Sequence, residues 1–218
     1  MSGADKLIAG YRRFRDGYYN DNKELLVKLA EDGQFPKIAL ISCCDSRVEP
    51  TIIMDCEPGD LFVIRNVANL VPPCETSTTF HGTSAALEFA VNGLEVDSII
   101  ILGHTQCGGI KALMDSEPFS EPKTFIAAWM KQLENIKNEI LADEKYVSAE
   151  HRSHACEKQG IAQSLKNLMT FPWIKSRVEG GQLKLHGWYY DLNSAELFAL
   201  QENADTMLEN HAEFQKIS

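Results

Sequence analysis

Residues 37–47 read KIALISCCDSR, an apolar run that ends in a polar, cysteine-containing loop. Residues 98–109, SIIILGHTQCGG, repeat that pattern. Short apolar runs without polar alternation are typical of strands buried on both faces, as in parallel sheets. Both segments therefore predict buried strands whose carboxyl ends carry polar loops.

The pattern around these two segments predicts an α/β fold. Residues 61–64 (LFVI) form a third expected strand, and Gly93 closes an apolar-periodic helix at 79–92. Because strands alternate with helices, we expect a mostly parallel central β-sheet flanked by helices. Residues 123–169 are expected to be helical. Residues 183–192 (LKLHGWYYDL) are expected to form a late edge strand, followed by C-terminal helices.

The N-terminal segment has a different pattern. Apolar side chains recur at helical spacing over residues 4–32, interrupted by glycine and asparagine. We expect a pair of helices there, forming an N-terminal arm (1–34) that packs on a partner subunit. Residues 35–218 are expected to form one α/β catalytic domain that binds a metal.

Composition limits the partners of the chain. Its 218 residues carry a formal net charge of −10 and no long Lys/Arg block, which argues against nucleic acid as a partner. No segment approaches the roughly 18 apolar residues of a membrane-spanning helix, and the N-terminal segment lacks the apolar core of a secretory signal. The 6 cysteines have no regular spacing and indicate reduced thiols. We therefore expect a cytoplasmic protein, or an organelle protein after removal of a presequence.

The two polar loops carry potential metal ligands, namely Cys43, Asp45, His104 and Cys107. Thiolates with an imidazole favour zinc over calcium or magnesium, which prefer oxygen ligands. Side chains alternate along an extended chain, so Cys43 and Asp45 share one side and Cys44 is expected to point into the core. Three protein ligands plus water make a catalytic zinc site, whereas four make a closed one.

Arg47 bears on that choice because it follows Asp45 by two residues. Its guanidinium is suited to a bidentate pair that keeps the carboxylate away from the metal. A binding protein with a closed Cys2HisAsp zinc site stays open as an alternative. A phosphatase or sulfurtransferase that uses Cys43 with Arg47 is a further alternative. Asp45 argues against it, because an adjacent carboxylate raises the pKa of a thiol and repels anionic substrates.

Five segments spread over most of residues 34–192 share one family pattern: CCDSR (43–47), PGDLFVIRNVANLVPP (58–73), HGTSAALEFAV (81–91), GHTQCGG (103–109) and, more weakly, LHGWYYDL (185–192). With them the chain resembles the β-class carbonic anhydrases of the plant-like type. The resemblance implies one zinc ion per chain, bound by Cys43, His104 and Cys107, and a dyad of Asp45 and Arg47. It also implies reversible hydration of carbon dioxide to bicarbonate and a proton, by attack of zinc-bound hydroxide. The alternative is hydrolysis of carbon disulfide or carbonyl sulfide at the same zinc site.

The resemblance further implies a substrate pocket. Phe62, Val67 and Phe89 would line it, and the backbone amide of Gly108 would face the substrate. Gln34 matches a glutamine that plant-type members donate across the dimer interface. We therefore expect a homodimer, or a tetramer or larger assembly of such dimers.

Some members of the family have an inhibitory bicarbonate site built from a tryptophan, an arginine and a tyrosine. Arg65 and Tyr190 match two of these residues, but Leu40 stands where the tryptophan would be. The resemblance therefore favours an enzyme without this inhibitory site.

Overall fold

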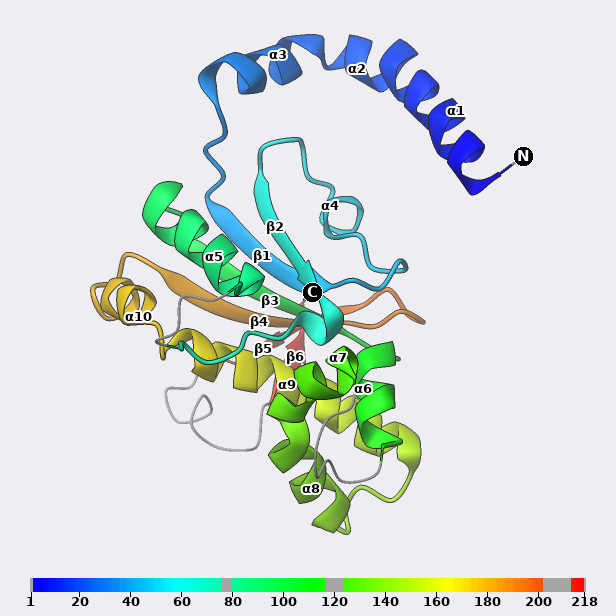
Figure 1. The fold of residues 1–218 in the computed structure, drawn as a ribbon, viewed down its shortest axis with the longest axis vertical. Helices are drawn as coiled ribbons and strands as arrows, with labels where there is room; N and C mark the ends of the chain where they lie inside the picture. The colour runs from blue at the N-terminus through cyan, green and yellow to red at the C-terminus, as the bar shows by residue number, and fades with distance from the viewer. Residues whose placement is uncertain (1, 76–79, 117–123, 202–212, 218) are drawn as a thin grey trace.

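The computed structural model describes residues 2–75, 80–116, 124–201 and 213–217. At its centre lies a 6-stranded sheet with the strand order β2-β1-β3-β4-β5-β6 (Figure 1). The strands are β1 (Ile38–Cys43), β2 (Leu61–Asn66), β3 (Ser98–His104), β4 (Lys184–Tyr190), β5 (Leu197–Leu200) and β6 (Phe214–Lys216). Strands β2, β1, β3 and β4 are parallel, and β5 and β6 add to them antiparallel. The predicted mostly parallel α/β fold is confirmed.

Strands β1 and β3 are buried on both faces, as their uninterrupted apolar runs predict. Ala39 and Ile41 belong to the core on one side of the sheet. Leu40 lies between them in the chain and packs with Ile100 and Leu102 on the other side. This double burial explains why neither strand shows polar alternation.

The predicted position of β4 at the edge of the sheet is wrong. Strand β4 pairs with β3 on one side and with β5 on the other. A turn after Leu192 returns the chain as β5, where we had expected helix, so antiparallel pairing covers the exposed side of β4. Residues 202–212, where the expected C-terminal helix would continue, lie outside the described residues.

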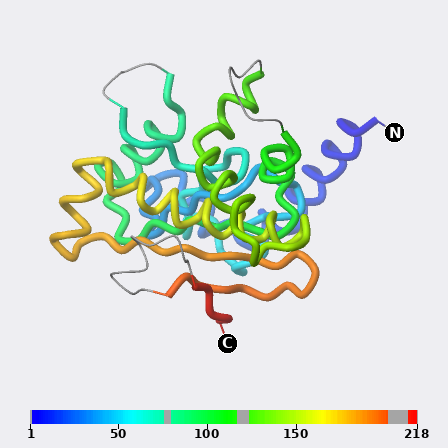
Figure 2. Tube along the Cα trace, turned by 90° about the horizontal axis from the view of Figure 1, so that it is seen from below, coloured from blue at the N-terminus to red at the C-terminus, as the bar shows by residue number. Residues whose placement is uncertain are grey.

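The helices of the body, which pack mainly against one face of the sheet, are α4 (Pro50–Ile53), α5 (Gly82–Glu88), α6 (Gly108–Met114), α7 (Phe125–Met130), α8 (Glu134–Ala142), α9 (Ala149–Leu168) and α10 (Pro172–Glu179). Three further helical turns are η1 (Val67–Asn69), η2 (Phe89–Gly93) and η3 (Lys131–Leu133). Figures 1 and 2 show α9 and α10 on one face of the sheet. Helix α9 crosses β3 and β4 and also contacts α6, so it lies beneath the loops at the carboxyl ends of these strands.

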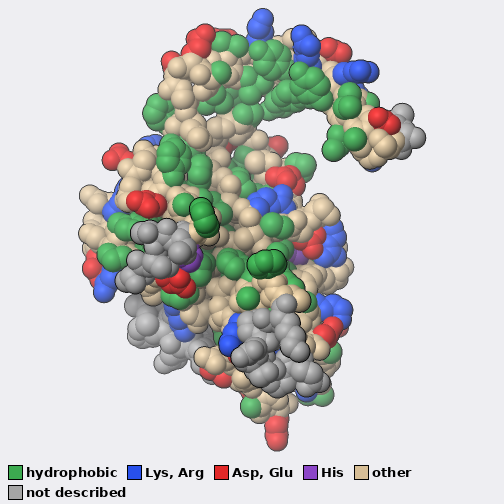
Figure 3. Space-filling view, in the orientation of Figure 1, with side chains coloured by type: hydrophobic (Ala, Val, Ile, Leu, Met, Phe, Trp, Pro, Cys, Tyr) green, Lys and Arg blue, Asp and Glu red, His purple; other side chains and the backbone are tan. Residues whose placement is uncertain are grey.

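The N-terminal arm consists of three helices rather than two: α1 (Gly3–Asp16), α2 (Tyr18–Asp21) and α3 (Lys23–Asp32). It extends away from the sheet (Figure 1), and none of the described residues of these helices is buried. Figure 3 shows that hydrophobic side chains gather on the concave side of the arm. Among the described residues, no helix combines the length and apolar character needed to cross a membrane.

Candidate metal centre

Cys43 and His104 are the last residues of the neighbouring parallel strands β1 and β3. Cys107 follows three residues later and precedes helix α6. All three side chains are buried, and their ligand atoms lie within 4.8 Å of one another. In the part of the chain that the structure describes, this is the one group of three or more His, Cys, Asp or Glu residues with such spacing. We call it the Cys/His group.

The geometry of the Cys/His group fits a zinc ion. Two thiolates at about 2.3 Å from a tetrahedral zinc would be about 3.8 Å apart, and the two Sγ atoms here are 3.9 Å apart. The Nδ1 atom of His104 lies 2.8 Å from the carbonyl oxygen of Thr105. We therefore assign the ring proton to Nδ1, which donates it to this oxygen. The Nε2 atom is buried without a hydrogen-bond partner among the described residues. An unpaired buried nitrogen beside two thiols forms a Cys2His donor set, which is one of those that bind zinc in proteins.

The two thiols influence each other strongly. The hydrogen bond with Cys107 lowers the pKa of Cys43, and the same contact raises the pKa of Cys107, to which burial adds. The contact therefore favours ionisation of Cys43 and opposes ionisation of Cys107. A divalent cation held here would be bound by both sulfurs as thiolates, since thiolates rather than thiols are metal ligands.

Asp45 lies beside the Cys/His group, and its carboxylate forms an ion pair with Arg47. Arg47 donates from Nε to Oδ1 at 2.9 Å and from a terminal nitrogen to Oδ2 at 2.7 Å. The backbone amide of Arg47 also donates to Oδ1 at 2.9 Å. These hydrogen bonds outweigh partial burial and hold the pKa of Asp45 well below its ordinary value. Arg47 is itself anchored to the carbonyl oxygen of Gln106 at 3.0 Å.

Arg65 holds the backbone of the loop that carries this dyad. Its guanidinium donates to the carbonyl oxygens of Cys43 at 3.0 Å, Asp45 at 2.8 Å and Val48 at 2.6 Å. It also donates to Glu49 Oε2 at 2.7 Å, forming an ion pair. A charged residue on β2 therefore determines the path of the loop after β1.

Cys44 is exposed, which contradicts its predicted position in the core. Its amide still donates to the carbonyl oxygen of Asn66 at 2.9 Å, so the chain keeps the direction of β1 up to this point. The chain then turns at Ser46 and Arg47, and the Cys44 side chain is left exposed among the described residues.

The structure brings together only part of the predicted substrate pocket. Val67 directly follows β2 and contacts the start of α6, where Gly108 lies beside Cys107. Phe62 and Phe89 contact each other with ring centroids 5.9 Å apart. Phe62 is level with Ala39, four residues before Cys43, or about 13 Å at 3.3 Å per residue. Gln34 is exposed on the segment before β1. Within one chain, Gln34, Phe62 and Phe89 do not adjoin the Cys/His group.

An apolar cleft of about 720 Å³ opens beside Val67. Trp129 lines it and donates from Nε1 to the carbonyl oxygen of Val67 at 2.8 Å. Phe80 and Phe125, at 108% and 98% exposure, project from its rim. Sequence reasoning missed Trp129, because its contact joins residues 62 positions apart and no local motif marks it.

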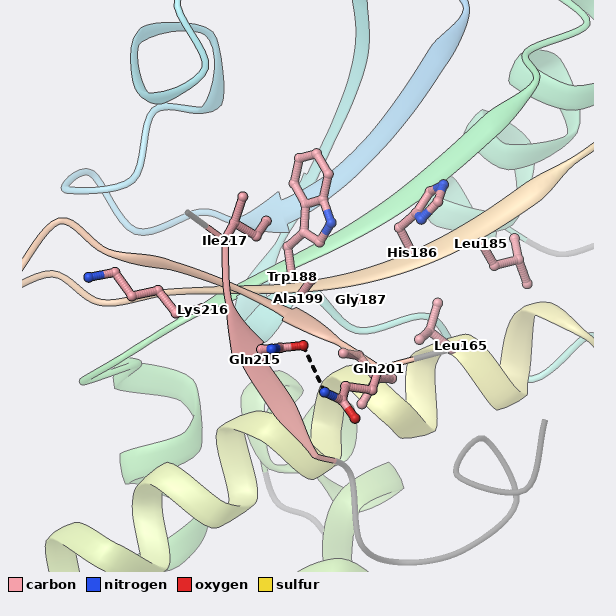
Figure 4. A pocket seen from close by; sticks show the side chains of 11 residues that line it. Leu165, Leu185, His186, Gly187, Trp188, Ala199, Gln201, Gln215, Lys216 and Ile217 are labelled. Carbon is pink, nitrogen blue, oxygen red and sulfur yellow. Dashed lines mark hydrogen bonds between the residues drawn. The ribbon is translucent and has the colours of Figure 1, made fainter. Parts of the chain in front are cut away.

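A second cavity, of about 500 Å³, lies around β4, β5 and β6 (Figure 4). Trp188 and the pair formed by Gln201 and Gln215, joined by a 2.8 Å hydrogen bond, lie among its lining residues. Its described lining residues include no member of the Cys/His group or of the dyad, so the two sites are separate.

The fold and site define an α/β protein with a potential Cys2His metal centre at the carboxyl ends of its parallel strands. The carbonic anhydrase family model matches residues 38–197. A carbonic anhydrase of Synechocystis is 38% identical over 194 residues, covering 89% of this chain and 70% of that protein. Beta carbonic anhydrase 5 of Arabidopsis thaliana, named as chloroplastic, is 41% identical over 187 residues, covering 86% of this chain and 61% of that protein.

Solved structures agree with these matches. The β-carbonic anhydrase CcaA superimposes with a TM-score of 0.88 at 35% identity, covering 100% of this chain and 93% of that chain. A structure described as a tetrameric β-carbonic anhydrase of Sordaria macrospora superimposes with a TM-score of 0.71 at 29% identity, covering 90% and 93% of the two chains. The chain therefore belongs to the carbonic anhydrase family of lyases, in its β class. The resemblance read from the sequence is confirmed, whereas the cytoplasmic location stays a prediction.

Proposed function

We propose that the chain binds one zinc ion through Cys43, His104 and Cys107 and reversibly hydrates carbon dioxide to bicarbonate and a proton. The observation that carries this proposal is the buried, unpaired Nε2 of His104 next to two thiols 3.9 Å apart. A bound zinc ion supplies the Lewis acidity that makes water a nucleophile near neutral pH. The protein supplies the ligands, the orientation and a site from which bulk water is excluded.

Asp45 has the role of an orienting acceptor in this proposal. Because Arg47 engages both of its oxygens, the carboxylate is held away from the Cys/His group and leaves a fourth position for water. Asp45 remains ionised and can accept a hydrogen bond from the attacking water, which directs the lone pair of that water at carbon dioxide. In this proposal the backbone amide of Gly108 donates to an oxygen of the substrate.

We infer that the site is permanently open rather than controlled by bound bicarbonate. Leu40 is fully buried in the sheet, where it offers no polar group to an anion. The Arg65 guanidinium is already engaged by Glu49 and by three backbone carbonyl oxygens. An anion at Arg65 would have to displace Glu49, which argues against an inhibitory site there.

We further propose that a second copy of the chain completes the substrate pocket. Gln34, Phe62 and Phe89 lie away from the Cys/His group of their own chain. The arm meanwhile exposes apolar side chains that include Tyr11 at 59% and Phe14 at 44%. Such a surface favours burial in an assembly.

The substitution Phe14→Asp tests this role of the arm. It should shift sedimentation toward the monomer and lower the activity per chain. Arg13→Glu, on the charged side of α1, should change neither property.

The deciding experiment measures metal content and three activities on one preparation. We expect about one zinc per chain and rapid hydration of carbon dioxide. Carbonyl sulfide and carbon disulfide should be poor substrates; slow hydration with fast hydrolysis of either would favour the alternative enzyme. Stoichiometric zinc with no hydration at any alkaline pH would favour a closed structural site.

A further inference from the structure

Glu157 is a buried carboxylate that the proposed reaction does not use. It lies on α9, and only 4% of its surface is exposed. Its Oε1 accepts a hydrogen bond from the backbone amide of Cys107 at 3.0 Å. Its Oε2 accepts one from the hydroxyl of Tyr189, on β4, at 2.6 Å. Both oxygens are therefore engaged, one of them by the backbone of a proposed zinc ligand.

Cys107 needs this acceptor because of where it lies in the chain. It follows Gln106, whose φ of 59° turns the backbone sharply after β3. Cys107 itself is extended, with φ −65° and ψ 121°, and precedes the first turn of α6. Its amide accordingly belongs neither to a strand ladder nor to the helix. A buried amide without an acceptor is costly, and Glu157 supplies the acceptor.

The contact also fixes the backbone from which the sulfur projects. The direction of the amide and the backbone angles of Cys107 set the Cα–Cβ bond, which carries Sγ. Glu157 and Tyr189 belong to α9 and β4, which pack against each other beneath this loop. The loop between β3 and α6 is thereby fixed to two rigid elements through the hydrogen bonds of Glu157.

We propose that Glu157, oriented by Tyr189, is a positioning residue that holds the Cys107 sulfur in place for zinc. This inference rests on the proposed function, because it assumes that Cys107 binds the metal. Groups that orient metal ligands typically contribute about 10- to 100-fold to metal affinity. A role in folding alone would instead lower the stability of the protein and leave the environment of the bound metal unchanged.

The test compares two replacements of similar length. Glu157→Gln keeps an oxygen that can accept from the Cys107 amide, whereas Glu157→Met fills the space without a comparable acceptor. The affinity for Zn²⁺ is measured by competition with a chromophoric chelator. The visible and near-ultraviolet spectrum of the Co²⁺-substituted protein reports the thiolate ligands directly. We expect Glu157→Met to weaken zinc binding by about 10- to 100-fold and to alter the cobalt spectrum, and Glu157→Gln to retain both properties.

Asn167→Leu is the matched control on the same helix. It removes a buried hydrogen bond of 2.7 Å to the carbonyl oxygen of Val71 and touches no member of the Cys/His group. It should lower stability yet keep zinc affinity and the cobalt spectrum. If Glu157→Met does not fold, Tyr189→Phe replaces it, since loss of the hydroxyl should also weaken zinc binding and alter the spectrum.

The outcomes separate this inference from the proposed function. If the wild-type chain binds no zinc, both fail. If the wild-type chain binds zinc and Glu157→Met binds it equally well with an unchanged cobalt spectrum, the inference alone is overturned. Loss of zinc binding in Glu157→Gln as severe as in Glu157→Met would also overturn it, because the hydrogen bond to Cys107 would then not be the cause. Unchanged properties of Tyr189→Phe would overturn the role of Tyr189.

Discussion

A single methyl group at Gly109 should disturb the proposed substrate side of the candidate metal centre. A Cβ atom there would lie 2.6 Å from Cγ1 of Val67, 3.3 Å from Cβ of Ala68 and 3.4 Å from Sδ of Met130. Favourable carbon–carbon contacts lie at about 3.5–4.0 Å, so Gly109→Ala requires a displacement of about 1 Å. The strain comes from contact rather than from torsion, because Gly109 lies within helix α6.

Val67 has little freedom to move away. Its carbonyl oxygen accepts the 2.8 Å hydrogen bond from Trp129, and Ala68 follows it with a left-handed φ of 62°. Overpacking of this kind costs about 1–3 kcal/mol, and the better helix propensity of alanine offsets up to about 1 kcal/mol of it. A shift of about 1 Å in a positioning group can lower a rate by about 100-fold. We therefore expect Gly109→Ala to lose more activity than stability.

The assay is carbon dioxide hydration per zinc-loaded folded chain, combined with urea unfolding. Gly187→Ala is the control, since a Cβ there would lie 2.9 Å from Ile161 and 3.1 Å from Leu165, on β4 and away from the Cys/His group. It should lose comparable stability and keep its activity per folded chain. Wild-type activity of Gly109→Ala would refute the reasoning, and so would an equal loss of activity in both variants.

Three further predictions concern the ligands, the dyad and pH. Cys43→Ala should lose zinc while Cys44→Ala keeps it, because Cys43 is buried in the Cys/His group and Cys44 is exposed. Metal analysis measures this, and the reverse result would contradict the assignment of Cys43 as the ligand. Arg47→Ala removes the side-chain donors of Asp45 and should raise the pKa of that carboxyl toward its ordinary value. The rate of carbon dioxide hydration near neutral pH should then fall by about 10- to 100-fold. Arg47→Lys should not restore this rate, since lysine cannot form the bidentate pair. Wild-type kinetics in Arg47→Ala would contradict the role of the dyad. Activity should rise toward alkaline pH. Two thiolate ligands would neutralise the charge of a zinc ion, which would then lower the pKa of water less than a zinc ion with neutral ligands does. A flat activity profile over about pH 6–9 would contradict this.

Much of the fold follows from local patterns in the sequence. The apolar runs at β1 and β3 predict buried strands because each carries its own burial pattern, independent of distant residues. The position of β4 does not follow in the same way. Its sequence alternates as an edge or one-sided strand would, and only the return of the chain as β5 places it inside the sheet. Pairing between strands depends on contacts that no local pattern encodes.

The sequence by itself determined the donor set of the candidate metal centre, since the chemistry of two thiols and an imidazole is a property of the residue types. It also placed Cys43 and His104 at strand ends, where parallel strands bring them together. Only the tertiary structure decided how those donors are held. The sequence already predicts the pair of Asp45 and Arg47, whereas the loop around it is secured by Arg65 and the Cys107 amide is held by Glu157. The contacts of Arg65 and Glu157 join residues about 20 and 50 positions apart, so they exist only once the sheet and α9 have packed.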